Sequence, residues 1–392
     1  MTRLPAVRPD VRAVASAVIE DRRTLHAWPE LSWKETQTQR FILDQLTAIG
    51  LDDVRPIAKT GATALYRGKG RGCVAWRADI DALPIPERSG LPFASRNEGV
   101  MHACGHDAHA AIALGIARVL QAHPRDDHGS VRFIFQPAEE AAGGAPACIA
   151  EGVLESPHVS RVLGMHISAD IPVGMVNVAP GPFFAMPTFI TIEIEGRAGH
   201  GAAPQQAIDA VVVAAHVITA LQTVVSRSAP PSEPAVLTIG TVQAGFRSNV
   251  IAESATLTGT IRSYSNQMKD HLVGHAQQVV AGVCAAFGAT ARFEHSTSCP
   301  PVVNDEALAA LTAAEANAYF GPGSVVAAPS MGADDMADFL QARPGVYAWF
   351  GARNEKKGIA GRHHDPGFVI DEDALPHAVE FGLRMIERTL AL

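Results

Sequence analysis

The chain has few cysteines and no surplus of basic residues, and each shortage argues against a class of protein. Five cysteines in 392 residues form an odd and scattered set, which excludes a disulfide framework and favours a reducing compartment. Lysine and arginine number 32 against 40 acidic residues, for a net charge of −8. We therefore expect neither nucleic acid nor a membrane surface among its partners.

Secretory and membrane-spanning segments are also missing. Residues 1–26 carry Pro5, Pro9 and interspersed charges instead of a continuous apolar stretch, so we expect no secretory signal. The most apolar later stretch, 210–225, contains His216 and Gln222 and is short for a bilayer. We expect a half-buried helix there and a cytoplasmic protein.

Apolar residues and histidine are plentiful. With 47% apolar and 18% charged residues, the chain is expected to fold around a sizeable core, and its length suits about two or three domains. Its sixteen histidines are about twice the usual share. Because histidine is the commonest metal ligand, this surplus hints at metal.

Both ends of the chain predict an α/β fold. Buried strands are expected at 72–80, 130–137 and 161–167, and helices at 11–27, 35–49 and 106–123. Strand, helix and strand in this order indicate a mixed, mostly parallel sheet flanked by helices. We assign residues 1–181 and 299–392 to one catalytic domain, because 299–392 has too little core to form a domain by itself.

The middle of the chain, 182–298, has a different pattern. The expected elements are a strand at 188–198, a helix at 206–226, strands at 235–245 and 254–265, a helix at 267–287 and a strand at 290–296. This order is that of a ferredoxin-like α+β domain, which we expect to be inserted into the first.

The segment MHACGHDAH (101–109) is the first with chemistry. It holds three histidines and a cysteine in a loop before a helix, and thiolate and imidazole both suit zinc or a similar ion. A single Cys-x-His pair such as Cys104 and His106 would more often be incidental. The density of ligand types favours a metal site.

Carboxylates and further histidines follow other strands. Asp79 and Asp81 share one face at a strand end, where a carboxylate can orient a ligand histidine. FQPAEE brings Glu139 and Glu140 to the carboxyl end of another strand, the edge at which open α/β sheets bind ligands. His166 also ends a strand. Taken singly, each has an ordinary structural explanation.

The ordered segments RADIDALP, MHACGHDAH, FQPAEE, GMH, GHGAAP, NVI, GTIR and a terminal His-x-Pro resemble one family. They are similar to the metal-dependent N-acyl-amino-acid amidohydrolases of the hippurate hydrolase and auxin-conjugate hydrolase type, within the aminoacylase and carboxypeptidase superfamily. The resemblance implies two divalent cations, zinc or manganese in the first place, with cobalt or nickel as alternatives. By matching position, the ligands fall on Cys104 as the bridging thiolate, His106, Glu140, His166 and His364.

The resemblance also implies the other roles. Glu139 matches the general base for a metal-activated water, and Asp81 a carboxylate behind the ligands. In the inserted domain, expected to act as a lid and to form a homodimer or homotetramer, His200 matches the residue that polarises the scissile carbonyl. That histidine often comes from the partner subunit. Asn249 and Arg262 match positions that bind the substrate carboxylate.

Other activities remain open. A small-molecule N-acyl amino acid is the expected substrate, but a dipeptidase or carboxypeptidase and an N-acetyl-diaminopimelate deacetylase are alternatives of the same fold. A cysteine-nucleophile hydrolase using Cys104 would be a different class. Asp334 stands where the family commonly has glutamate, and His363 lies beside His364, so only the His-x-Pro frame selects the ligand. The acyl group and the amino-acid side chain stay undetermined.

Overall fold

The computed structural model describes residues 4–392, and their contacts divide the chain into two units. The large unit runs to Phe183 and includes Val302–Pro329 and Asp334–Leu392. The small unit comprises Phe184–Pro301 and Ser330–Ala333. The sequence predicts domain boundaries after residues 181 and 298, and it predicts 330–333, which group with the small unit, as part of the catalytic domain.

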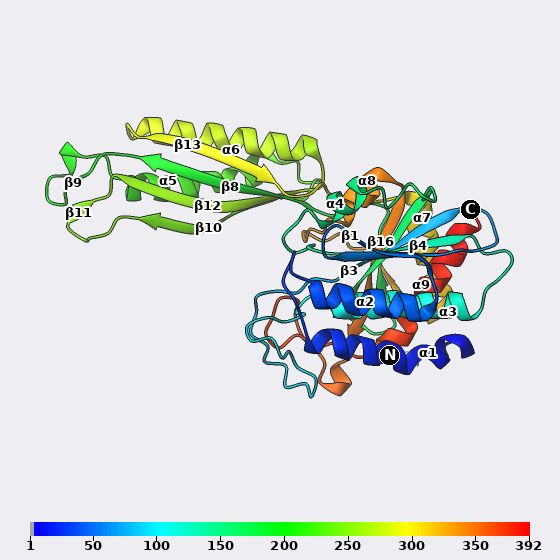
Figure 1. Cartoon of the computed structure of the whole chain (residues 1–392). Helices are drawn as coiled ribbons and strands as arrows, with labels where there is room; N and C mark the ends of the chain where they lie inside the picture. The colour runs from blue at the N-terminus through cyan, green and yellow to red at the C-terminus, as the bar shows by residue number, and fades with distance from the viewer. Residues whose placement is uncertain (1–3) are drawn as a thin grey trace. The chain divides into compact units, whose positions relative to one another are not determined.

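A mixed eight-stranded sheet is the centre of the large unit (Figure 1). Its order is β1 (Asp52–Ile57), β2 (Gly61–Tyr66), β4 (Ser130–Gln136), β3 (Cys73–Asp79), β5 (Arg161–Pro172), β16 (Gly345–Arg353), β6 (Val176–Asn177) and β15 (Val325–Val326). The four central strands β4, β3, β5 and β16 run parallel to one another, and antiparallel pairs lie toward the edges. The predicted mixed, mostly parallel sheet is confirmed.

Helices cover both faces of this sheet, as predicted (Figure 1). One face carries α1 (Pro9–Ala27), α2 (Thr36–Ile49), α3 (His106–Ala122), α7 (Glu306–Phe320) and α9 (Ala374–Leu390). The other carries the short helices α4 (Gly144–Ala150) and α8 (Met336–Ala342). The core beneath the longer helices contains the buried side chains of Trp76, Phe133 and Phe350. Burial of apolar side chains such as these supplies most of the stability of such a domain. A separate short ladder pairs β7 (Gly181–Phe184) with β14 (Val302–Asn304).

The small unit has the predicted order of elements. They are β8 (Met186–Glu195), α5 (Ala210–Thr223), β10 (Val236–Ala244), β12 (Ser254–Ser263), α6 (Asn266–Ala286) and β13 (Thr290–Thr297). The strands form one antiparallel sheet in the order β10-β12-β8-β13, and both helices pack on one face. Alternate side chains of β8, Ile190, Ile192 and Ile194, are buried against them. A two-stranded ladder joins β9 (Gly199–His200) to β11 (Val250–Ile251).

Helix α5 begins later and continues further than predicted. Residues Pro204–Gln206 form a 3-10 helix, and α5 begins after Asp209, whose side chain accepts the N–H groups of Val211 and Val212 as an N-cap. The helix then continues as a π-helical turn to Ser228. By length and composition alone, Ala210–Ser228 would suffice to cross a membrane. Buried positions such as Val217 instead pack in the small unit, in line with the predicted half-buried helix.

Candidate metal centre

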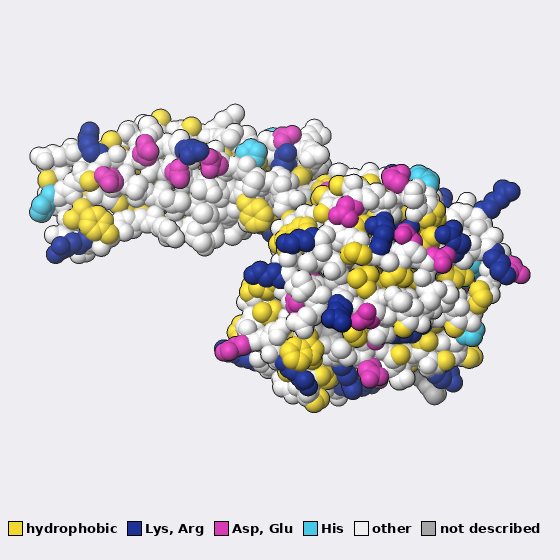
Figure 2. Space-filling model, viewed as in Figure 1, with side chains coloured by type: hydrophobic (Ala, Val, Ile, Leu, Met, Phe, Trp, Pro, Cys, Tyr) yellow, Lys and Arg dark blue, Asp and Glu magenta, His cyan; other side chains and the backbone are white. Residues whose placement is uncertain are grey.

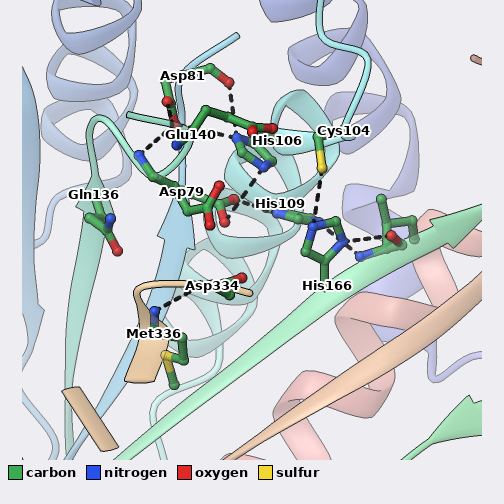
Figure 3. Close-up of polar contacts among 12 residues, drawn as sticks. Asp79, Asp81, Cys104, His106, His109, Gln136, Glu140, His166, Asp334 and Met336 are labelled. Atoms are coloured by element: carbon green, nitrogen blue, oxygen red, sulfur yellow. Dashed lines mark hydrogen bonds and ion pairs between the residues drawn. The ribbon is translucent and has the colours of Figure 1, made fainter. Parts of the chain in front are cut away.

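The candidate site of the large unit forms where parallel strands end. Strands β3, β4 and β5 are parallel neighbours, so the segments after Asp79 and Gln136 emerge at one edge of the sheet, close to His166 (Figure 3). Helix α3 begins at this edge and presents His106 and His109. These two residues are three positions apart and share one helix face.

The five residues proposed as ligands come together in two groups. Donor atoms of Cys104, His106 and His166 lie within 4.8 Å of one another, and so do those of Cys104, Glu140 and His364. Cys104 belongs to both groups, which is the arrangement expected of a side chain shared by two cations. Its Sγ lies 3.4 Å from His166 Nε2. Thiolate, imidazole and carboxylate together form a donor set suited to zinc and similar divalent ions.

The ligand histidines keep one nitrogen available. His106 Nδ1 donates to the backbone oxygen of Asp81 at 2.9 Å, while its buried Nε2 has no hydrogen-bond partner within the part of the chain that the structure describes. His166 Nδ1 donates to the carbonyl oxygen of Ile167 at 2.7 Å and leaves Nε2 to the site. A buried nitrogen without a partner costs free energy, and a bound cation would satisfy it. The residues present therefore fit divalent metal.

Charges around the site also suit a cation. Burial alone would lower the pKa of His106, but Asp79 and Asp81 outweigh it and raise that pKa to about 10. Burial and the neighbouring Glu140 and Glu139 raise the pKa of the Cys104 thiol well above its ordinary value. The carboxylates around the site thus create a negative field that favours a bound divalent cation.

His109 lies beside the ligands but uses both nitrogens elsewhere. Its Nδ1 contacts Asp79, and its Nε2 accepts the N–H of Ile167 at 2.8 Å. Asp79 also lies 3.8 Å from His106 Nε2. The His106 and His109 rings stack with centroids 5.3 Å apart. The sequence leaves the role of His109 open, and the contacts indicate that it supports the site.

The two adjacent histidines near the C-terminus have different surroundings. His364 Nε2 lies 3.3 Å from Glu140 Oε1, and its backbone has a φ of 63°, in the left-handed region that non-glycine residues rarely adopt. His363 Nε2 accepts the N–H of Ala169 at 3.3 Å, and its ring packs against Phe368. Only His364 joins a group of possible ligands, in agreement with the His-x-Pro frame.

Asp81 holds the loop that carries the proposed base. Its Oδ1 accepts the N–H of Glu139 and its Oδ2 the N–H of Glu140, both at 3.1 Å, and Ser32 Oγ donates to Oδ2 at 2.7 Å. A donor atom of Glu139 lies within 4.8 Å of His106 and Glu140. Burial and the negative charge of Asp334 raise the pKa of Glu139 well above its ordinary value, the direction that a general base at neutral pH requires.

A buried charge cluster lies next to Glu139. Arg77 Nη1 donates to Asp79 at 2.7 Å, and Arg77 Nη2 donates to Asp335 at 2.9 Å. Nη2 also lies 3.1 Å from Asp334. Tyr347 Oη donates to Asp334 at 2.7 Å. Asp334, at the position where the family commonly has glutamate, therefore belongs to this cluster. The motifs do not single out Arg77, and the one sign of it in the sequence is an arginine inside the apolar run GCVAWRADI.

The remaining site candidates belong to the small unit. His200 pairs with Val250 across the β9–β11 ladder, and Gly201 donates its N–H to the carbonyl oxygen of Asn249 at 3.0 Å, so His200 and Asn249 lie together. Arg262 lies near the end of β12, far along the strand from that ladder. Its Nη1 is buried with no hydrogen-bond partner among the residues described. An orphaned guanidinium N–H of this kind suits an anionic ligand.

Known proteins resemble nearly the whole chain. Residues 75–388 match the model of peptidase family M20/M25/M40. The N-acetylcysteine deacetylase of Bacillus subtilis is 40% identical over 94% of this chain and 96% of its own length. The N-acetyldiaminopimelate deacetylase of Exiguobacterium sibiricum is 39% identical over 92% and 96%. The solved YXEP protein of Bacillus subtilis, described as a dinuclear metal-binding peptidase of the M20 family, has a TM-score of 0.83 at 34% identity, covering 97% of this chain and 99% of that one.

Proposed function

Because the chain belongs to peptidase family M20/M25/M40, we propose that it cleaves the amide bond of N-acyl amino acids to a carboxylic acid and a free amino acid. The family expected from the sequence motifs is confirmed, and the chain is a metal-dependent amidohydrolase. The observation that supports the reaction best is the pair of three-donor groups sharing Cys104, with Glu139 beside them.

Five side chains would hold two divalent ions. These ligands are Cys104, His106, Glu140, His166 and His364. Two bound divalent ions act as Lewis acids that polarise a carbonyl oxygen and lower the pKa of a water toward 7. Zinc and manganese suit the donor set first, and cobalt and nickel share its preferences.

Glu139 is proposed to move the proton. Its carboxylate accepts a proton from the attacking water and later gives it to the leaving nitrogen, so that the amine departs neutral. Asp81 keeps Glu139 and Glu140 in fixed relation, because one carboxylate accepts both of their backbone N–H groups. The base would therefore meet the water from a position set by the hydrogen bonds of its loop to Asp81.

Residues of the small unit are proposed to bind the substrate. His200 donates to the carbonyl oxygen as negative charge develops there, and one such donor is worth about 3–4 kcal/mol of the activation barrier. Arg262 binds the α-carboxylate through its fork of N–H groups, one of which is orphaned. Asn249 is the second residue expected at that carboxylate, and because it lies with His200 far along the small unit from Arg262, it would reach the carboxylate from the partner subunit. A free carboxylate on the amino-acid half is thus the expected recognition element.

We place the reaction in the cytoplasm and in a homodimer or homotetramer formed through the small unit. Cys73, Cys104, Cys148 and Cys284 are free thiols, which suits a reducing compartment. In the small unit, edge strand β10 is largely exposed over its second half. Exposed edges of this kind can pair with a second copy of the chain.

A substrate screen tests the proposed function. The purified protein, stripped of metal and resupplied with zinc, manganese, cobalt or nickel in turn, is offered N-acyl amino acids that vary in both halves. Metal-dependent release of free amino acid is expected. Activity that survives chelation would contradict the proposal and would support the alternative of a hydrolase with Cys104 as nucleophile. The same panel includes N-acetyl-diaminopimelate, the substrate class named for one relative, and C-terminally free dipeptides.

A further inference from the structure

Glu35 is a buried carboxylate that the proposed mechanism does not use. It precedes the first residue of α2, and its side chain has no exposed surface. Its Oε1 accepts the backbone N–H of Ala138 at 2.8 Å, and its Oε2 accepts the hydroxyl of Thr60 at 2.6 Å. Glu35 and Ala138 are 103 positions apart in the sequence. The contact therefore joins the N-terminal region to the residue directly before Glu139.

Ala138 depends on this contact. Its backbone has a φ of 52°, in the left-handed region that side chains other than glycine rarely adopt, and the residue is completely buried. Without Glu35 its N–H would be buried and unpaired, which is unfavourable. Both effects would drive Ala138 toward an ordinary conformation. The chain direction at the next residue, Glu139, would then change.

Two carboxylates hold three consecutive N–H groups of this loop. Glu35 binds residue 138, and Asp81 binds residues 139 and 140. The two supports are linked, because Ser32, in the turn directly before Glu35, donates to Asp81 at 2.7 Å. Glu30 anchors that turn by accepting the N–H of Thr38 at 2.9 Å, and its carbonyl oxygen accepts the N–H of Ala82 at 2.8 Å.

We propose that Glu35 is a positioning residue for the reaction: through its hydrogen bond to Ala138 it fixes the backbone conformation that aims Glu139. This inference rests on the proposed function, in which Glu139 is the base. It assigns to Glu35 an effect on turnover and not on substrate binding. The four proposed ligands other than Glu140 come from other segments, so cation binding should depend on Glu35 only weakly.

Two substitutions at Glu35 separate the effect of the hydrogen bond to Ala138 from the effect of the negative charge. Glu35→Gln keeps an oxygen at the same distance for Ala138 and loses the charge. Glu35→Asp keeps the charge and withdraws the oxygen by one methylene. For a positioning hydrogen bond, Glu35→Asp should lower kcat by about 10–100-fold with KM nearly unchanged, since small misplacements of catalytic groups have effects of this size. Glu35→Gln should remain within about 5-fold of the wild type on the same scale.

Glu380 supplies the matched control. It is another fully buried carboxylate of the large unit, on α9, and it accepts the N–H of Arg8 at 3.1 Å and Nε of Arg384 at 2.9 Å. Glu380→Asp should lower the melting temperature without lowering kcat. Metal stoichiometry and amide hydrogen exchange of Ala138 are measured in every variant. Faster exchange at Ala138 is expected in Glu35→Asp alone.

The outcomes distinguish the two proposals. If the wild type hydrolyses its substrate, Glu139→Gln abolishes turnover and Glu35→Asp retains full kcat, the role of Glu35 is wrong while the function stands. If Glu35→Gln has a lower kcat than Glu35→Asp, the charge of residue 35 matters more than its hydrogen bond to Ala138, and the inference is again overturned. If Glu139→Gln remains active, the base assignment fails first.

Discussion

Cys104 Sγ and His166 Nε2 lie 3.4 Å apart although 62 positions separate them in the sequence. His166 Nδ1 donates to the carbonyl oxygen of Ile167, so Nε2 is the ring nitrogen that faces Cys104. Burial and the neighbouring imidazole of His109 lower the pKa of His166 well below its ordinary value, so the ring stays neutral, the form that binds metal. This pair is where the metal assignment is most directly testable.

Cys104→Ala should lose bound metal. The thiolate is proposed as a ligand of both ions, so its removal weakens both sites, and activity should fall with metal content. Metal analysis of the purified protein, with added zinc or manganese, measures the effect. Cys284→Ala, at a buried free cysteine of the small unit, is the control and should keep its metal. Full metal occupancy in Cys104→Ala would exclude the bridging role.

Glu139→Gln should keep its metal and lose turnover. Gln preserves the size of the side chain but cannot accept the proton, and general bases contribute about 10²–10⁴-fold to rate. Steady-state kinetics measures the loss of turnover, and metal analysis of the same preparation measures whether the metal is kept. Turnover within 10-fold of the wild type would rule out Glu139 as the base.

Mixed oligomers can locate the action of His200. Alone, His200→Ala should lower kcat by about 10²–10³-fold. If His200 serves the partner's site, co-expressed His200→Ala and Glu139→Gln subunits form dimers with one intact site, and about a quarter of wild-type activity returns for random pairing. If each His200 serves its own subunit, every site in the mixture stays defective and activity does not return.

Arg77→Met should destabilise the large unit strongly. The guanidinium is buried among Asp79, Asp334 and Asp335, and its removal leaves carboxylates buried without their counter-ion. Removing one partner of a buried ion pair typically costs about 3–5 kcal/mol. Urea unfolding measures the change. Arg67→Met is the control: Arg67 and its partner Asp52 are both more than half exposed, so a loss under about 1 kcal/mol is expected.

His377 should make the protein sensitive to acid. Burial lowers its pKa, and Tyr319 Oη lies 2.8 Å from Nδ1, a contact in which the hydroxyl donates to the neutral ring. Since the folded pKa lies below the unfolded one of about 6.5, the unfolded state binds more protons between these values, and stability falls as the pH falls. Urea unfolding between pH 7 and 5 should show a smaller loss for His377→Gln. Equal losses would show that His377 does not contribute.

Much of the architecture could be predicted from the sequence because strands buried on both faces consist mostly of consecutive apolar residues. The strand expected at 161–167 in fact extends to Pro172, since Ser168 and the residues after it continue the pairing with β16 despite their polarity. Strand β1 escaped prediction for a related reason. It is a mostly exposed edge strand with charged residues, and only its ladder with β2 keeps it extended.

The candidate site divides in the same way. Residues of short motifs, such as Cys104 and His106, can be proposed from spacing and order. The supports of those residues cannot, because their partners are remote: Arg77 meets Asp335 across 258 positions, and Glu35 meets Ala138 across 103. Such contacts depend on how the strands are ordered in the sheet, and no local pattern contains that order.

The hold of Asp81 on two neighbouring residues couples two tasks. One carboxylate fixes both Glu139, which handles the proton, and Glu140, which handles the cation. Neither residue can be moved to suit a larger or smaller substrate without disturbing the other. Adaptation of this enzyme to a new acyl group, in nature or by engineering, would therefore have to change the walls around the loop and leave the loop itself alone.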